Sequence, residues 1–303
     1  MKMYKRCGWL ALSLVSVVVC FLLQIMGSVV GLLIYAFAGY VQLFSSLEGM
    51  DDAAIEAEVS AIMQDAATEG IGLCLVLAHL LMIVCFALWY ALGCGKPRLK
   101  EAKGVFVPKT LLVVLLVAGG MCFFTNFALP VMEPIIPEKI MQNYIDLMEQ
   151  AGFGVDALAI FASVCLAPFG EEFLCRGIIF HYGKKMVADL ENRKLAFWIA
   201  NTLQALMFGI IHGNIIQGSY AFLMGLALGY LAHRFHSIVP AIMGHMLINA
   251  TSTFAWEPIA LALPESYAVY AIGAAVSLAV AFLGLYLGGP AEKKVKAGTG
   301  EVA

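Results

Sequence analysis

Several polar side chains that could carry chemistry stand inside otherwise apolar segments in the second half of this 303-residue chain. These residues are Glu171, Glu172, Arg176, His212, His245 and Asn249. An ionisable side chain within an apolar helix in lipid costs on the order of a few kcal/mol, so each one needs a physical explanation. Carboxylates, imidazoles and an amide are the groups with which hydrolytic sites move protons and stabilise an oxyanion.

The two adjacent glutamates, Glu171 and Glu172, differ in whether a nearby cation can pair with them. Glu172 and Arg176 are four residues apart, which places them on one helical face, where they can pair. Pairing offsets much of the cost of burying them, so a structural ion pair explains them as well as a functional role does. Glu171 points about 100° away along the helix and has no cation nearby in sequence. Glu171 is therefore the stronger candidate for a general base or acid.

The histidines gain meaning only in combination. His212 ends an apolar run one turn after Phe208, and alone it is typical of an interfacial residue. His245 and Asn249 share a helical face, which hydrogen bonding between helices would also explain. Together, Glu171 and an imidazole can activate a water, while the second imidazole and the amide stabilise the oxyanion. The alternative is a zinc ion on Glu171, His212 and His245, although the chain has no H-E-x-x-H motif.

The elements that must position these residues are membrane-spanning helices. The chain is 62% hydrophobic and 13% charged, with a mean hydropathy of +0.89. Soluble domains are about 45–50% apolar and about 25% charged, so a water-soluble globule, a disordered chain and a nucleic-acid-binding protein are all disfavoured. The pattern predicts an all-α polytopic membrane bundle of about eight transmembrane helices. The predicted spans are 9–44, 71–94, 110–132, 155–180, 195–213, 219–233, 238–255 and 266–288.

Charge orients this bundle. If the spans alternate and the N-terminus is cytoplasmic, every Lys and Arg except Arg176 and Lys139 falls on the cytoplasmic side. We therefore expect both termini in the cytoplasm, in the plasma membrane, and an acidic amphipathic helix within residues 46–70 outside. The expected organisation is an N-terminal membrane region with three spans (1–150), a catalytic membrane core with five spans (151–290) and a cytoplasmic tail (291–303).

The polar motifs, in this order and on successive spans, resemble those of the CPBP family of intramembrane endopeptidases. That family includes the type II CAAX prenyl proteases and bacteriocin-immunity proteins. The family pattern E-E-x-x-x-R, F-x-x-x-H and H-x-x-x-N is met by Glu171-Glu172…Arg176, Phe208…His212 and His245…Asn249. Further similar positions are Gly177, Gly225, Gly229 and Ile238-Val239-Pro240. The resemblance covers roughly residues 155–255, and the first 150 residues match no known pattern.

The resemblance implies roles for the motif residues. Glu171 and His212 would activate water, His245 and Asn249 would support the oxyanion, and Glu172 and Arg176 would be structural neighbours. It leaves open whether zinc takes part, with Glu171, His212 and His245 as the candidate ligands.

The predicted function is endopeptidase cleavage of membrane-associated protein or peptide substrates, within membrane lipid and without nucleic acid. The alternatives are a non-catalytic immunity factor or scaffold that keeps the fold, and a transporter with a polar midplane site. The absence of a visible inverted repeat disfavours the transporter. We interpret His79, alone in an apolar span, as a hydrogen-bonded packing residue, and His181, His233 and His236 as interfacial.

Overall fold

The computed structural model describes residues 3–94, 106–150 and 156–289, and within these ranges it contains helices and no strand. The predicted cytoplasmic tail 291–303 lies outside the described residues, as do several of the basic residues on which the predicted topology rests. Those residues are Lys2, Lys96, Arg98, Lys100, Lys103, Lys293, Lys294 and Lys296.

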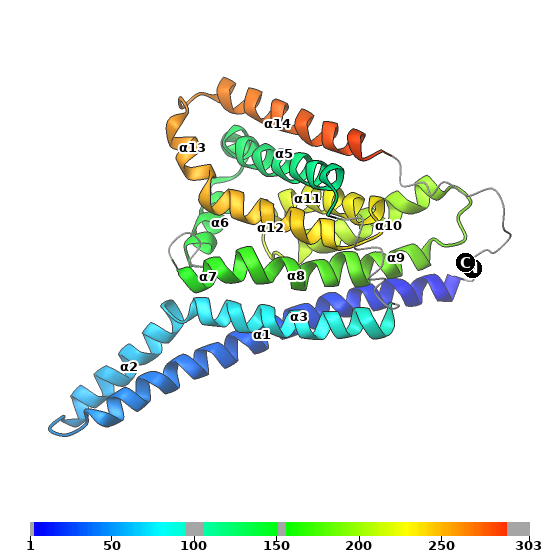
Figure 1. Cartoon of the computed structure of the whole chain (residues 1–303). Coiled ribbons are helices and arrows are strands. Elements are labelled where there is room, and N and C mark those ends of the chain that lie inside the picture. The colour runs from blue at the N-terminus through cyan, green and yellow to red at the C-terminus, as the bar shows by residue number, and fades with distance from the viewer. Residues whose placement is uncertain (1–2, 95–105, 151–155, 290–303) are drawn as a thin grey trace.

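The long helices run nearly parallel in stacked layers (Figure 1). The N-terminal helices α1 and α3 form one side, the helix α7–α9 lies next to them, α10–α12 follow, and α5 and α14 form the far side. The bounds are α1 Met3–Ser45, α2 Asp52–Thr68, α3 Ile71–Gly93, α5 Pro108–Met132, α6 Glu138–Gln150, α7 Ala157–Phe161, α8 Ala167–Glu172, α9 Phe180–Met186, α10 Arg193–Ile210, α11 Ile215–Arg234, α12 Val239–Phe254, α13 Trp256–Ala262 and α14 Tyr267–Gly288.

This architecture is the polytopic helical bundle expected from the hydropathy pattern. Within the described ranges, six helices are long and apolar enough to cross a membrane. The other two predicted spans correspond to α10 and α12. Helix α12 has only 16 residues, and α10 starts at Arg193 and carries buried Asn201 and Gln204, which lower its hydropathy. Helix α12 packs between α5, α8 and α11, whereas α10 buries one face against α9 and α11 and exposes the other, with Leu195, Trp198, Leu206 and Ile210.

The N-terminal pair of helices packs through small residues. A side chain at Gly27 would overlap the backbone of Ala78, and one at Gly31 would lie 2.7 Å from the Cα of Cys74. The two glycines therefore allow α1 and α3 to approach closely, as is usual for helices in lipid. Helix α1 has 43 residues, and its second half projects beyond the other layers together with α2 (Figure 1). The acidic segment 46–70 does contain the helix that its periodicity predicts.

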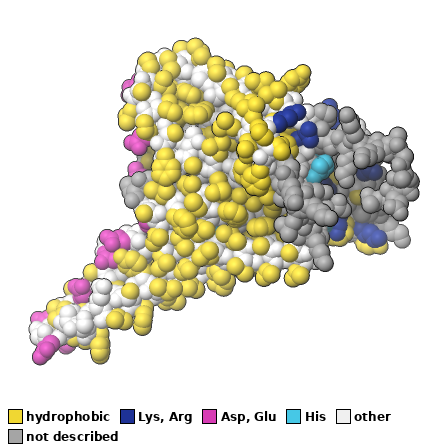
Figure 2. Space-filling view, viewed as in Figure 1, with side chains coloured by type: hydrophobic (Ala, Val, Ile, Leu, Met, Phe, Trp, Pro, Cys, Tyr) yellow, Lys and Arg dark blue, Asp and Glu magenta, His cyan; other side chains and the backbone are white. Residues whose placement is uncertain are grey.

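Charged side chains gather at opposite ends of the bundle, and a wide apolar belt separates them (Figure 2). The acidic end contains the first turns of α2, α6 and α13, with Asp52, Glu138 and Glu257. The basic end contains the last turns of α9 and α11, with Lys184, Lys185 and Arg234, and the start of α10. The bundle thus has a marked charge polarity along its long axis, although which end faces the cytoplasm stays a prediction.

Candidate functional site

The helix that carries the two glutamates has an irregular middle. It starts at Ala157, where the Asp156 side chain accepts hydrogen bonds from the backbone N–H groups of Leu158 and Ala159. Two π-helical stretches, Ala162–Leu166 and Phe173–Ile179, flank the short α-helix α8. Pro168 stands near the start of α8 and cannot donate a backbone hydrogen bond, which favours the wider turn before it. Such widened turns are frequent at functional sites because they reorient the side chains that follow.

Glu172 and Arg176 form the ion pair expected from their spacing. Arg176 Nη1 lies 2.7 Å from Glu172 Oε1, and both side chains are completely buried. Arg176 Nη2 donates to the carbonyl oxygen of Gly225 on α11 at 3.2 Å, and the guanidinium stacks 4.4 Å from the centre of the Phe208 ring. The pair therefore ties three helices together rather than one.

Helix α11 can approach this pair because of its glycine stripe. A side chain at Gly225 would lie 2.9 Å from the Cα of Ala205 on α10, and one at Gly229 would overlap the amide oxygen of Asn201. The Gly225 carbonyl accepts a second hydrogen bond, from Gln204 Nε2 at 2.9 Å, and Gln204 also donates to Asn201 Oδ1 at 2.8 Å. The result is a buried polar network behind the ion pair.

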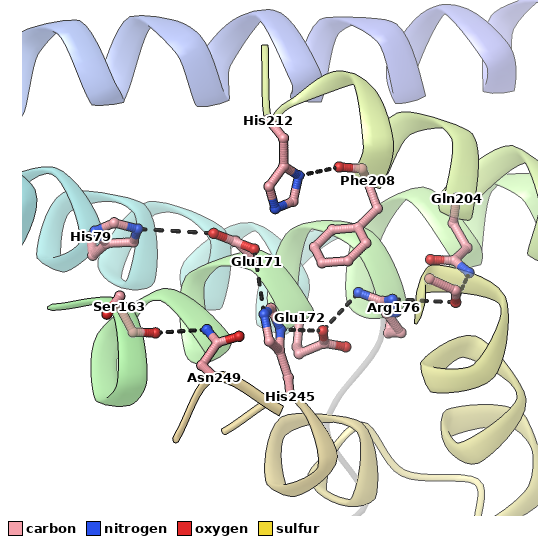
Figure 3. A network of polar contacts seen from close by, with 11 residues as sticks. His79, Ser163, Glu171, Glu172, Arg176, Gln204, Phe208, His212, His245 and Asn249 are labelled. Carbon is pink, nitrogen blue, oxygen red and sulfur yellow. Dashed lines mark hydrogen bonds and ion pairs between the residues drawn. The ribbon is translucent and has the colours of Figure 1, made fainter. Parts of the chain in front are cut away.

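Glu172 also holds a histidine. His245 Nδ1 on α12 lies 2.9 Å from Glu172 Oε1, the same oxygen that accepts from Arg176 (Figure 3). An ionised carboxylate only accepts hydrogen bonds, so this contact places a proton on Nδ1. The other ring nitrogen, Nε2, then faces away from Glu172 and lies 3.8 Å from Glu171 Oε2. Glu172 thus orients His245 as well as pairing with Arg176, a contact that the sequence motif does not reveal.

Glu171 forms no ion pair with a Lys or Arg side chain among the described residues. Its side chain is 12% exposed, and Oε2 is buried with no hydrogen-bond partner among the described residues. Two imidazole nitrogens face it from other helices: His245 Nε2, and His79 Nε2 on α3 at 3.9 Å from Oε1 (Figure 3). A carboxylate left without partners and surrounded by imidazoles is arranged to accept a proton.

His79 is therefore more than a packing residue. Its Nδ1 lies 2.7 Å from the carbonyl oxygen of Leu75, which is the hydrogen bond that the packing interpretation predicts. That contact directs Nε2 towards Glu171, and His79 lines the same cavity. The packing interpretation is thus incomplete. The available sequence signal is that the predicted span 71–94 contains no Asp, Glu, Lys or Arg and a single histidine, His79.

His212 is fixed by the turn between α10 and α11. This turn is short because Gly213 adopts a positive φ of 72° and the Asn214 side chain accepts a hydrogen bond from Gln217 N at 2.7 Å, starting the next helix. His212 Nδ1 lies 2.7 Å from the carbonyl oxygen of Phe208, and this backbone contact orients the ring. Phe208 makes a T-shaped ring contact with each of the two imidazoles. The centre of its ring lies 4.9 Å from that of His212 and 5.5 Å from that of His245.

Asn249 lies one turn beyond His245 on α12. Its Nδ2 donates to the carbonyl oxygen of Ser163, in the first π-helical stretch, at 2.8 Å. An amide nitrogen has two N–H groups, so one remains available to a ligand.

A cavity of about 470 Å³ joins these groups. Four of the six predicted residues, Glu171, His212, His245 and Asn249, line it. Glu172 and Arg176 do not line it and lie in the sealed network behind it. Its size is within the range of about 300–1,000 Å³ that is usual for ligand sites.

The zinc alternative requires three ligands that converge. Among the described residues, no group of three His, Cys, Asp or Glu side chains is arranged to hold a metal ion. Glu171 and His245 approach each other, but His212 does not complete a ligand set with them. The observed donor arrangement therefore does not fit the zinc site that the sequence left open, and the mechanism below uses the side chains alone.

The fold and the cavity define a helical integral membrane protein with a polar site inside its bundle. Residues 153–251 match the type II CAAX prenyl endopeptidase Rce1-like family, which confirms the resemblance drawn from the three motifs over this third of the chain. This is a family of CAAX-type intramembrane proteases. No curated protein and no solved structure matches the chain.

Proposed function

We propose that this protein is an intramembrane endopeptidase that hydrolyses peptide bonds of membrane-associated substrates with a water activated by Glu171. The observation that carries the proposal is the contrast within one helical turn: Glu172 is held through Oε1 by Arg176 and His245 and does not line the cavity, whereas Glu171 forms no such pair and borders the cavity. Among the described residues, Oε2 of both carboxylates lacks a hydrogen-bond partner, but only that of Glu171 belongs to a cavity-lining residue. Burying an unpaired carboxylate is costly, and a structural role would not require it.

The side chains around the cavity supply the steps of hydrolysis. Glu171 accepts a proton from water while the water oxygen bonds to the carbonyl carbon of the substrate. His212 can assist, because its Nδ1 is engaged with the Phe208 carbonyl and its Nε2 is free to accept. The electron pair of the carbonyl moves to its oxygen, giving a tetrahedral oxyanion. Glu171 then returns the proton to the leaving nitrogen as the C–N bond breaks.

The oxyanion needs donors, and α12 provides two. The contact of Nδ1 with Glu172 turns Nε2 of His245 towards the cavity, where the imidazolium form can donate an Nε2–H to the oxyanion. The second N–H of Asn249 adds a neutral donor one turn away. These roles explain why a charged pair is buried directly behind the site: Glu172 orients His245, and Arg176 holds Glu172 in place.

Peptide cleavage by the purified, reconstituted protein tests this proposal. Glu171→Gln keeps the shape of the side chain but cannot accept a proton, so the rate should fall about 10²–10⁴-fold. Glu58→Gln, on the exposed face of α2, is the matched control and should cleave like the wild type. Mass-spectrometric mapping of products in membranes containing either variant would identify the substrates. A folded Glu171→Gln protein that cleaves at the wild-type rate would show that this site is not a peptidase and would favour the scaffold alternative.

The same cleavage assay, repeated with a chelator, tests whether a metal ion is needed. Because the described donors form no three-ligand group, we expect chelation to leave the cleavage rate unchanged. Loss of activity with chelator and recovery with zinc would replace this mechanism by a metal-assisted one, with Glu171, His212 and His245 as ligands.

A further inference from the structure

The cavity extends in one direction from Glu171. From His245 it follows α12 and the start of α13 through Asn249, Ser252, Trp256 and Glu257. Within α12, Ser252 lies seven residues beyond His245, a rise of roughly 10 Å at 1.5 Å per residue. His245 at the inner end is 5% exposed, Asn249 is partly buried, and Ser252 and Glu257 are exposed.

In the opposite direction the cavity is closed. Behind Glu171 lie the buried pair Glu172–Arg176 and the buried Asn201 and Gln204. A hydrophobic cluster from α1, α3 and α10 surrounds this network and continues along the second π-helical stretch with Leu174, Cys175, Ile178 and Ile179, all completely buried. The structure therefore contains no opening from the catalytic groups to the basic end of the bundle within the described residues.

The opening lies at the acidic end. Besides Trp256 and Glu257 of α13, the cavity lining includes Tyr144 and Met148 of α6. Helices α6 and α13 occupy the end of the bundle that also holds α2 and the start of α7, opposite α9 (Figure 1). The Lys and Arg side chains gather at the other end (Figure 2). Basic segments of membrane proteins face the cytoplasm, so the opening faces away from it.

We infer that the catalytic cavity is loaded from the extracytoplasmic side, and that its substrate is a short extended peptide segment exposed on that side of the membrane. A segment at the cytoplasmic surface would meet the sealed, basic end of the bundle instead. The cleavage of this segment rests on the proposed function, but the direction of access does not.

Cysteine labelling in intact cells and in inside-out vesicles, with a membrane-impermeant thiol reagent, tests the inference. Ser252→Cys places a thiol inside the cavity, and Ser60→Cys on α2 marks the acidic end. Native Cys7, exposed near the start of α1, marks the basic end. Mapping labelled peptides by mass spectrometry reads each thiol separately. We expect the reagent to label Ser60→Cys and Ser252→Cys in intact cells, and Cys7 only in inside-out vesicles.

If Ser252→Cys is labelled only in inside-out vesicles, as expected for Cys7, the inference is overturned. Labelling of Ser60→Cys only in inside-out vesicles would also overturn it. Labelling from neither side would show that the opening is closed and would also contradict it. Glu257→Cys, at the exposed rim, replaces Ser252→Cys if that variant does not fold. None of these measurements requires cleavage, so a protein that labels as expected but hydrolyses no peptide contradicts the proposed function alone.

Discussion

Two consecutive residues of one helix, Glu171 and Glu172, occupy opposite environments. Glu172 is completely buried and accepts hydrogen bonds from Arg176 at 2.7 Å and from His245 at 2.9 Å through one oxygen. Glu171 borders a cavity, and its Oε2 has no hydrogen-bond partner among the described residues, with His245 Nε2 3.8 Å away. The difference suggests a division of roles between neighbouring carboxylates: the one held by Arg176 and His245 fixes geometry, and the one that borders the cavity is placed to take a proton from water.

The sealed region should respond to mutation through stability. Removing one partner of a buried ion pair leaves the other charge uncompensated, at about 3–5 kcal/mol. Arg176→Ala should therefore lower the free energy of unfolding in detergent by about this amount, because Glu172 loses its cation and the Gly225 carbonyl loses a donor. Glu171→Gln, in the open region, should leave the free energy of unfolding near that of the wild type. Equal stability of Arg176→Ala and wild type would contradict the contrast between the two regions.

The open region should respond through rate. Asn249→Ala removes a donor for the oxyanion and should lower kcat about 10²–10³-fold, with little effect on KM. It also removes the hydrogen bond to Ser163, which on average contributes about 0.6 kcal/mol between helices in lipid. Asn143→Ala, on the exposed face of α6, controls for the loss of an amide. If Asn249→Ala lowers the free energy of unfolding but not kcat, Asn249 has a structural role, as Glu172 and Arg176 do.

Much of this fold was predictable from the sequence. The predicted spans 71–94 and 266–288 correspond to α3 at Ile71–Gly93 and α14 at Tyr267–Gly288. This agreement has a physical cause. In lipid the backbone N–H and C=O groups must hydrogen-bond within the helix, and the side chains over the length of the span must be apolar, so the apolar run gives the length of the helix directly. The pair Glu172–Arg176 was predictable for a similar reason, since both residues lie on one helix with a fixed spacing.

Contacts between helices were not predictable in this way. The hydrogen bond from His245 to Glu172 and the approach of His79 to Glu171 join helices far apart in sequence. They depend on how each helix is rotated and how closely glycines such as Gly225 let it pack, and a periodicity within one helix contains neither quantity. The motifs therefore identified four residues of the cavity but not the orientation of their side chains.

His79 provides the last and smallest expected effect. It lies on α3, outside the family match at 153–251, yet its Nε2 faces Glu171 Oε1 at 3.9 Å. This distance is too long for a direct hydrogen bond, so a bridging water is the reasonable link, and the contribution to the rate should be modest. We expect His79→Phe to lower kcat about tenfold, which corresponds to about 1.4 kcal/mol.

His79→Gln separates positioning from packing. Both substitutions remove the contact of Nδ1 with the Leu75 carbonyl, but glutamine can still hydrogen-bond to a water beside Glu171 whereas phenylalanine cannot. Partial recovery of kcat in His79→Gln relative to His79→Phe, at equal folded yield, would show that α3 contributes a positioning residue to the open region. If both variants have the wild-type kcat, His79 is a packing residue only. The groups that take part in catalysis would then all lie in the 153–251 segment.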